Sequence, residues 1–150
     1  MIAPLLAAAA VGAPAPCSPA DTRRVVAAFV GAWNRGELAA VDRLIARPPV
    51  FKWFSSGAPG ARIGAASANR RALLRYVAAR HARHDRIRLR WFRHNGSDVR
   101  TDGRYGHFEY ELERSADDWK GGAAFVAPGK GAVNCSGGRT TIAVWSMSGG

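Results

Sequence analysis

The sequence predicts an α+β fold in which a strongly curved, mainly antiparallel sheet wraps three N-terminal helices. Apolar residues first recur at helical spacing in three stretches, over residues 18–36, 38–45 and 67–83, with one short strand expected at 50–54. Strand-like stretches then follow one another, over residues 86–92, 106–113, 130–135 and 139–147. Helices gathered ahead of a run of strands indicate an α+β fold, which 150 residues can form as one domain.

The first helix has a recognisable start and end. Ser18 is the expected N-cap, with Pro19 at the first helical position and Asp21 three residues after the cap. The helix should end near Asn34-Arg35-Gly36. Between these points one apolar face repeats at helical spacing, in Val25, Val26, Phe29, Val30 and Trp33. The pattern predicts an amphipathic helix.

Two further helices flank the short strand. The second is expected over residues 38–45, and Arg47-Pro48-Pro49 stops it. Residues 55–66 predict a loop rich in glycine and alanine. Ser67 is the expected cap of a third helix that reaches about Arg83.

Residues 86–114 predict the central hairpin, because each strand alternates apolar with charged residues. The first strand alternates with arginines and the second with glutamates. One register satisfies both faces, and a slip by one residue would turn the apolar face to water. It pairs Ile87 with Leu112, Leu89 with Tyr110, Trp91 with Phe108, Arg86 with Glu113, Arg88 with Glu111 and Arg90 with Glu109.

A second hairpin is predicted at the end of the chain. It joins residues 130–135 to 139–147 across Ser136-Gly137-Gly138. The polar segment at residues 115–129, which precedes this hairpin, is predicted to be a loop. Asp117, Asp118 and Trp119 lie near its start.

Two stretches resemble the nuclear transport factor 2-like superfamily. One is Val26-x-x-Phe29-x-x-x-Trp33-Asn34-x-Gly36-Glu37 with the following helix, and the other is Ile142-Ala143-Val144-Trp145-Ser146-Met147. The resemblance covers about residues 20–147. It implies a cone-shaped fold with an apolar pocket between sheet and helices, and dimerisation across the sheet. It implies no reaction, because the superfamily includes isomerases, dehydratases, cyclases and inactive domains.

The candidate pocket residues are the aromatic side chains that this cone would enclose, together with Arg114, which continues their face. They are Trp33, Trp53, Tyr76, Trp91, Phe108, Tyr110, Arg114 and Trp145. The same aromatic residues equally suit a packed core. Arg114 could hold a carboxylate or phosphate, and Asp117 or Asp118 could be a general base with a raised pKa, or all three could be solvated.

Residues 1–16 resemble a secretory signal in their apolar, alanine-rich run, which is shorter than a membrane span. The other interpretation is a disordered tail. With this leader removed, residues 17–150 form a single exported domain, secreted or held in the periplasm or cell envelope. Cys17 and Cys135 are the only cysteines, and an even count in an exported chain predicts a disulfide between them.

The formal charge of +11 arises from 22 basic and 11 acidic residues, and nine arginines fall within residues 70–93. Such a surface suits nucleic acid or another acidic polymer. We disfavour nucleic acid, because several of these arginines face glutamates in the predicted hairpin and an exported protein rarely meets it. The four histidines match no metal signature, and no cofactor motif is found.

The sequence therefore favours an exported, non-catalytic domain that binds an apolar small molecule or a protein partner, without a cofactor or metal. The first alternative is a cofactor-independent lyase or isomerase that acts on an apolar ring substrate and uses Asp118 with Tyr110 or Arg114. The second alternative is a structural envelope domain whose aromatic residues fill the cone. No membrane span is expected in the mature chain.

Overall fold

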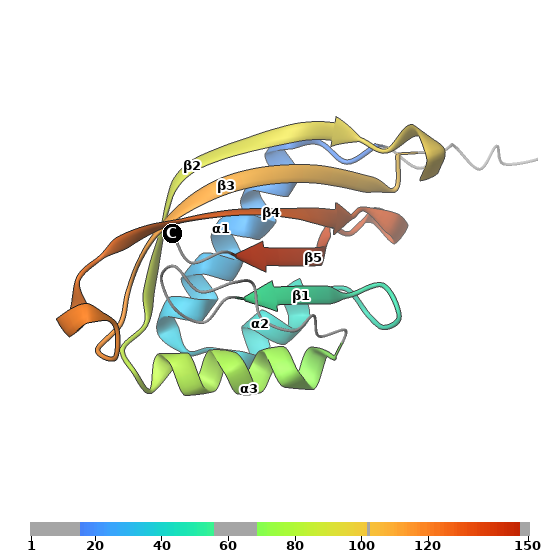
Figure 1. Ribbon diagram of the computed structural model, residues 1–150. Coiled ribbons are helices and arrows are strands. Elements are labelled where there is room, and N and C mark those ends of the chain that lie inside the picture. Colours follow the sequence, from blue (N-terminus) through green and yellow to red (C-terminus); the bar gives the residue numbers. More distant parts are fainter. Residues whose placement is uncertain (1–15, 56–68, 102, 148–150) are drawn as a thin grey trace, which may run out of the picture.

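A curved five-stranded sheet holds three helices on its concave side (Figure 1). The computed structural model describes residues 16–55, 69–101 and 103–147. The predicted α+β architecture is confirmed. Most of the predicted leader, most of the loop at 55–66 and the expected cap Ser67 lie outside the described residues.

The helices begin and end where local signals place them. Helix α1 spans Pro19–Arg35, and the Ser18 hydroxyl accepts a hydrogen bond from the backbone N–H of Asp21 at 3.0 Å. It ends at Gly36, whose φ of 67° suits a residue without a side chain. Helix α2 spans Leu38–Leu44, and α3 spans Arg70–His81 with Asn69 as its cap. Side-chain caps therefore set the N-terminal ends of α1 and α3.

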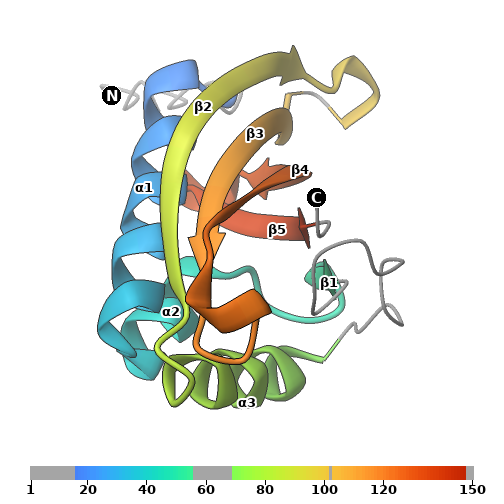
Figure 2. The ribbon, with the colours of Figure 1, turned by 60° about the vertical axis from the view of Figure 1, so that its left-hand side comes forward.

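The strands lie in the order β1-β5-β4-β3-β2. Strand β1 pairs in parallel with β5, and all other pairs are antiparallel. Figure 2 shows the long arc of β2, which runs from the end of α3 along α1, with β3 beside it in the opposite direction. Part of the predicted loop at 115–129 belongs to the sheet, because β4 starts at Phe125. The strands are β1 (Lys52–Ser55), β2 (Arg86–Ser97), β3 (Tyr105–Ser115), β4 (Phe125–Asn134) and β5 (Thr141–Met147).

The predicted register of the central hairpin is wrong. Leu89 pairs with Leu112, Arg88 pairs with Glu113, and a bulge at Arg90 then shifts the pairing by one residue. An extra residue in one strand reverses which face each later side chain takes. Beyond the bulge Trp91 therefore stands opposite Glu111 on the outer face of the sheet.

The bulge also exchanges one aromatic residue for another in the core. Phe92 replaces Trp91 on the inner face and stacks on Phe108, with ring centroids 5.8 Å apart. Trp91 is 44% exposed, the larger of two exposed large apolar side chains in the described part of the chain. Arginines of β2 still face glutamates of β3, but the individual pairs differ from those predicted. Arg93, for example, pairs with Glu109 at 2.6 Å.

Two glycines of β4 make room for aromatic rings on the concave face. A Cβ atom at Gly129 would collide with the Tyr110 ring and with the Ser146 carbonyl oxygen, and one at Gly131 with the Phe108 ring. Both rings therefore lie flat across β4. The Tyr110 hydroxyl reaches β5 and donates a hydrogen bond to the Ser146 carbonyl at 2.8 Å.

A disulfide joins Cys17 to Cys135, which confirms the predicted pairing. It ties the residue before the cap of α1 to the residue after β4, across a sequence separation of 118 residues. Closing a loop of this length stabilises a fold by roughly 4–5 kcal/mol in the chain-entropy model.

Candidate functional site

Seven aromatic side chains form one contiguous group on the concave side of the sheet. Trp145 stacks on Tyr110 at 4.5 Å and contacts Phe29 at 4.6 Å. Tyr76 on α3 contacts Trp53 at 4.9 Å and Trp33 at 5.9 Å. We call this group the inner aromatic cluster: Phe29, Trp33, Trp53, Tyr76, Phe108, Tyr110 and Trp145. It contains every predicted pocket aromatic except Trp91.

Three tryptophans of the cluster carry unpaired donors. The indole N–H groups of Trp33, Trp53 and Trp145 are buried and meet no hydrogen-bond acceptor among the described residues. Trp53 and Trp145 are register partners on adjacent strands, and Trp33 on α1 joins the same cluster through Phe29 and Tyr76. A buried donor without an acceptor costs about 1–3 kcal/mol, so three in one cluster are unusual.

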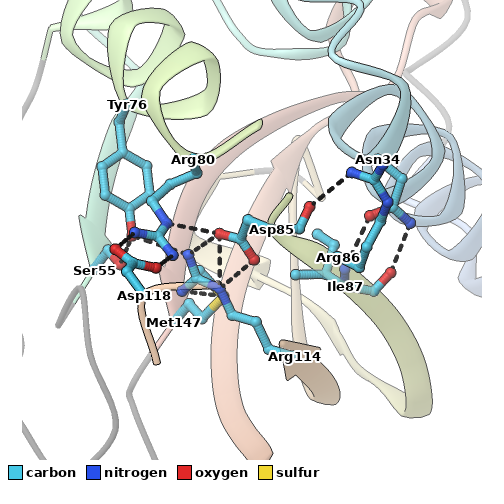
Figure 3. A network of polar contacts seen from close by, with 10 residues as sticks. All are labelled: Asn34, Ser55, Tyr76, Arg80, Asp85, Arg86, Ile87, Arg114, Asp118 and Met147. Carbon is cyan, nitrogen blue, oxygen red and sulfur yellow. Dashed lines mark hydrogen bonds and ion pairs between the residues drawn. The ribbon is translucent and has the colours of Figure 1, made fainter. Parts of the chain in front are cut away.

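Arg114 and Asp85 form a buried ion pair beside the cluster (Figure 3). The Arg114 guanidinium donates to both Asp85 carboxylate oxygens, and its shortest contact is 2.5 Å. The pair is almost completely buried, with side chains 2% and 0% exposed. Since a buried charge requires a partner, each residue fixes the other.

A second arginine extends this pair into a chain of four charges. Arg80 on α3 donates to Asp85 at 2.9 Å and to both carboxylate oxygens of Asp118, at 2.8 and 2.9 Å. The ring of Trp119 lies between the two arginines, 4.1 Å from the Arg80 guanidinium and 4.2 Å from that of Arg114. Burial would lower the pKa of Arg80, but its hydrogen bonds to Asp118 and Asp85 raise it above its usual range.

Tyr76 links the charged chain to the aromatic cluster. Its hydroxyl accepts a hydrogen bond from Arg114 at 3.1 Å and lies 2.8 Å from the Ser55 hydroxyl at the end of β1 (Figure 3). The Tyr76 side chain is only half-buried, whereas Trp33 behind it is fully buried. Tyr76 therefore separates the inner aromatic cluster from solvent.

Solved structures with the same arrangement of helices and sheet identify the fold. No family model matches the chain, and no curated protein matches it. A protein from Streptomyces avermitilis, proposed to be a dehydratase of the NTF2-like family, superposes with a TM-score of 0.67 over 87% of this chain and 94% of that one, at 13% identity. The chain has the nuclear transport factor 2-like fold.

Two other structures agree with this assignment. An NTF2-like protein from Novosphingobium aromaticivorans has a TM-score of 0.65 at 11% identity and covers 86% of this chain and 79% of its own. The β subunit of benzoate 1,2-dioxygenase from Burkholderia mallei has the same score and identity, over 87% of this chain and 89% of that one. Proteins with this fold thus differ in their reported roles, and likeness at this identity indicates the fold alone.

The nuclear transport factor 2-like fold explains the motif around Asn34. This side chain, at the end of α1, accepts from the backbone N–H of Ile87 at 2.9 Å and donates to the Ile87 carbonyl at 2.7 Å. Asn34 therefore acts as an extra strand partner for β2. The amide thereby fixes the end of α1 against the sheet.

The three weak catalytic candidates are all held by other groups of the protein. Arg114 is paired with Asp85, and a hydrogen bond from Arg80 lowers the pKa of the Asp118 carboxyl. A general base at an apolar rim would need the opposite shift. Burial raises the pKa of the Tyr110 hydroxyl, outweighing the charge of Arg114.

Sequence reasoning missed Asp85, Arg80 and Trp119. Arg80 had a detectable signal, because it follows Leu73 and Val77 at helical spacing and so shares their buried face. Asp85 sits in the short connection between α3 and β2, where an acidic residue looks solvated. Nothing local indicates that Trp119 folds back between two arginines.

A second hollow lies on the outer face of the sheet, around Trp91. Its volume is about 310 Å³, and Trp91, Pro128 and Ser146 are among the residues that line it. Two glutamates and a lysine also line it: Glu109, Glu111 and Lys130. Elsewhere in the described residues, no three metal-binding side chains cluster, and no helix is long and apolar enough to cross a membrane.

Proposed function

We propose that this protein is an exported, non-catalytic binding protein that holds an apolar ring compound in the inner aromatic cluster. The compound carries a hydrogen-bond acceptor, such as a ketone or ester oxygen. The Cys17–Cys135 disulfide supports an oxidising location in a secreted or envelope protein.

The observation that carries the proposal is that the indole N–H groups of Trp33, Trp53 and Trp145 meet no acceptor in the part of the chain that the structure describes. A packed core alone would favour phenylalanine at these positions, since phenylalanine buries an aromatic ring without a donor. An acceptor brought by a ligand would remove the cost of the unpaired N–H groups. Flat aromatic walls with few polar groups are the usual lining of sites for apolar small molecules.

The geometry supports entry of the ligand beside Tyr76. This side chain is half-buried, and its hydroxyl has two partners that can re-form their bonds with water or with the ligand, Ser55 and Arg114. Rotation of Tyr76 would open the face of Trp33 and Trp53 that it now covers. The ligand therefore replaces a movable ring and leaves the buried ion pair in place.

Binding without catalysis is supported by the state of the acidic groups near the cluster. The Asp85 carboxylate is fully buried and bonded to two arginines, so it has neither a free lone pair directed at a ligand nor access to water. Asp118 is bonded to Arg80 through both oxygens. A cofactor-independent lyase, the alternative, would need one of these carboxylates as a free base.

The proposal is tested by calorimetric titration with two matched probes, 2-acetylnaphthalene and naphthalene. The ketone should bind about three- to tenfold more tightly, as expected for one added hydrogen bond. Trp145→Phe should remove this preference, whereas Trp91→Phe on the outer face should retain it. Equal affinity for both probes in the wild type would contradict a hydrogen bond from the indole donors. No binding of either probe would contradict a ligand role and would favour a core in which the aromatic residues fill the cone.

The outer face supports a second role, the pairing of two copies. Trp91 is 44% exposed on this face and lies on β2, an edge strand of the sheet. Arginines of β2 and glutamates of β3 lie beside it in adjacent rows, as Arg88 with Glu113 and Arg93 with Glu109. A two-fold axis through such a face would set the basic row of one copy against the acidic row of the other. We therefore propose a homodimer formed across the sheet.

A further inference from the structure

A separate pocket lies outside the cone, between the segment after α2 and the turn that joins β4 to β5. Its volume is about 560 Å³, which is within the range of sites for small organic ligands. One wall is apolar and is formed by Ile45, Ala46, Pro48 and Val50. Neither the aromatic cluster nor the outer hollow contributes to it.

Three arginines line this pocket: Arg43, Arg47 and Arg139. The Arg139 guanidinium donates to the backbone carbonyl of Arg43 at 2.8 Å, which holds it across the mouth. None of the three forms an ion pair with a carboxylate of the described chain. Each carboxylate of the described chain except that of Glu111 is paired with a basic residue other than these three. Glu111 lines the outer hollow.

Asp42 is the acidic residue that lines the pocket, and Arg70 neutralises it. Arg70 donates to the Asp42 carboxylate at 2.5 Å and to the Ile45 and Ala46 carbonyls at 3.2 and 3.0 Å. These bonds satisfy the negative groups at the end of α2. The charge of the pocket is therefore set by the three arginines that line it.

Neutral donors complete the polar side of the pocket. The Asn134 side-chain oxygen accepts from the backbone N–H of Ser136 at 3.0 Å, which leaves the amide nitrogen as the donor. Ser136 and Thr141, which carry hydroxyl groups, also line the pocket. Several guanidinium and hydroxyl donors beside an apolar wall match a tetrahedral oxyanion attached to an organic group.

We propose that this pocket binds a phosphate monoester whose organic part is apolar. The arginines and hydroxyls hold the phosphate, and the wall from Ile45 to Val50 contacts the organic part. Three cations favour a dianion over a single carboxylate. The same chemistry is presented by a soluble phosphate ester and by the headgroup of phosphatidic acid.

Calorimetric titration with phenyl phosphate tests this assignment, with inorganic phosphate and benzyl alcohol as partial probes. Phenyl phosphate should bind one site and bind it more tightly than either partial probe. Arg47→Gln should weaken it about tenfold, as loss of a charge-assisted hydrogen bond requires. Arg139→Gln should weaken binding by the same factor. Thermal unfolding of this variant is measured in parallel, because Arg139 also donates a hydrogen bond to the Arg43 carbonyl. Arg75→Gln, an exposed arginine on α3, is the matched control.

Two outcomes would overturn the proposal. One is absence of saturable binding by phenyl phosphate. The other is equal weakening by Arg47→Gln and Arg75→Gln, which would indicate attraction to the whole basic surface. Vesicles of phosphatidylcholine with and without phosphatidic acid separate the sources. Binding to phosphatidic acid that Arg47→Gln reduces assigns the site to a lipid headgroup, and binding of phenyl phosphate without vesicle binding assigns it to a soluble ester.

Discussion

The Arg114 guanidinium lies 2.5 Å from the Asp85 carboxylate in the interior of the protein, where neither side chain meets solvent to any extent. Asp85 also accepts a hydrogen bond from Arg80, whose charge is shared with Asp118, so two carboxylates compensate two guanidinium groups. A buried pair of this kind adds little net stability compared with apolar residues, but breaking it leaves a charge without a partner.

Asp85→Asn should therefore destabilise the fold by about 3–5 kcal/mol, because Arg114 would keep its charge in the interior. The free energy of unfolding in urea measures this. Glu113→Gln is the control, since it breaks the exposed pair with Arg88 and should cost no more than about 1 kcal/mol. Similar losses in the two variants would indicate that the buried pair is solvated in solution.

Gly129→Ala should destabilise the protein by about 1–3 kcal/mol, because the new methyl group would collide with the Tyr110 ring and the Ser146 carbonyl. Gly31→Ala in α1 should have the opposite sign. Its Cβ would meet only the movable end of Arg35, and alanine favours a helix by about 0.5–1 kcal/mol. Thermal unfolding should show a lower midpoint for Gly129→Ala and a higher midpoint for Gly31→Ala. Stabilisation by Gly129→Ala would refute the flat placement of the Tyr110 ring.

Stability should fall in mild acid because of His94. Burial, and then the charge of His107, lowers its pKa in the folded protein below the ordinary value of 6.5. Between these two pKa values the unfolded chain binds more protons than the folded one, so stability rises with pH in this range. The contribution is present above about pH 6.5 and is lost below it.

The urea midpoint of His94→Gln, compared with that of the wild type at several pH values from 5 to 8, isolates this contribution. The difference between the two proteins should change with pH only on the acidic side of the unfolded-state pKa. A constant difference across the series would show that His94 titrates alike in both states.

Trp91→Asp should prevent association of two copies across the sheet while leaving each copy folded, since the side chain is exposed and lies outside the core. Sedimentation velocity should give a dimer for the wild type and a monomer for the variant. Trp91→Phe, which retains an aromatic surface, should remain dimeric. A monomeric wild type at all concentrations would contradict the proposed dimer.

Much of the fold follows from short-range signals in the sequence. The ends of α1 are fixed by local residues: Ser18 and Pro19 at its start and Gly36 after its end. A cap and a left-handed backbone conformation both depend on neighbouring residues alone. The pairing of Cys17 with Cys135 follows from the number of cysteines. These features require no knowledge of the tertiary structure.

The errors arise where distant parts of the chain decide the outcome. Alternating arginines and apolar residues look the same with or without a bulge at Arg90, although the bulge decides whether Trp91 or Phe92 enters the core. Asp85 and Arg114 are 29 positions apart, and the register of β2 with β3 brings them together, because Arg114 pairs with Ile87. The role of the aromatic residues also depends on unpaired donors, which no sequence pattern reveals.

The most direct test of ligand binding follows the five indole N–H resonances by NMR during titration with 2-acetylnaphthalene. Our account predicts that the signals of Trp33, Trp53 and Trp145 shift as a group, while those of Trp91 and Trp119 stay in place. Naphthalene should move the same signals much less, because it brings no acceptor. Shifts confined to Trp91, or no shift in any buried indole, would contradict a binding site inside the cone.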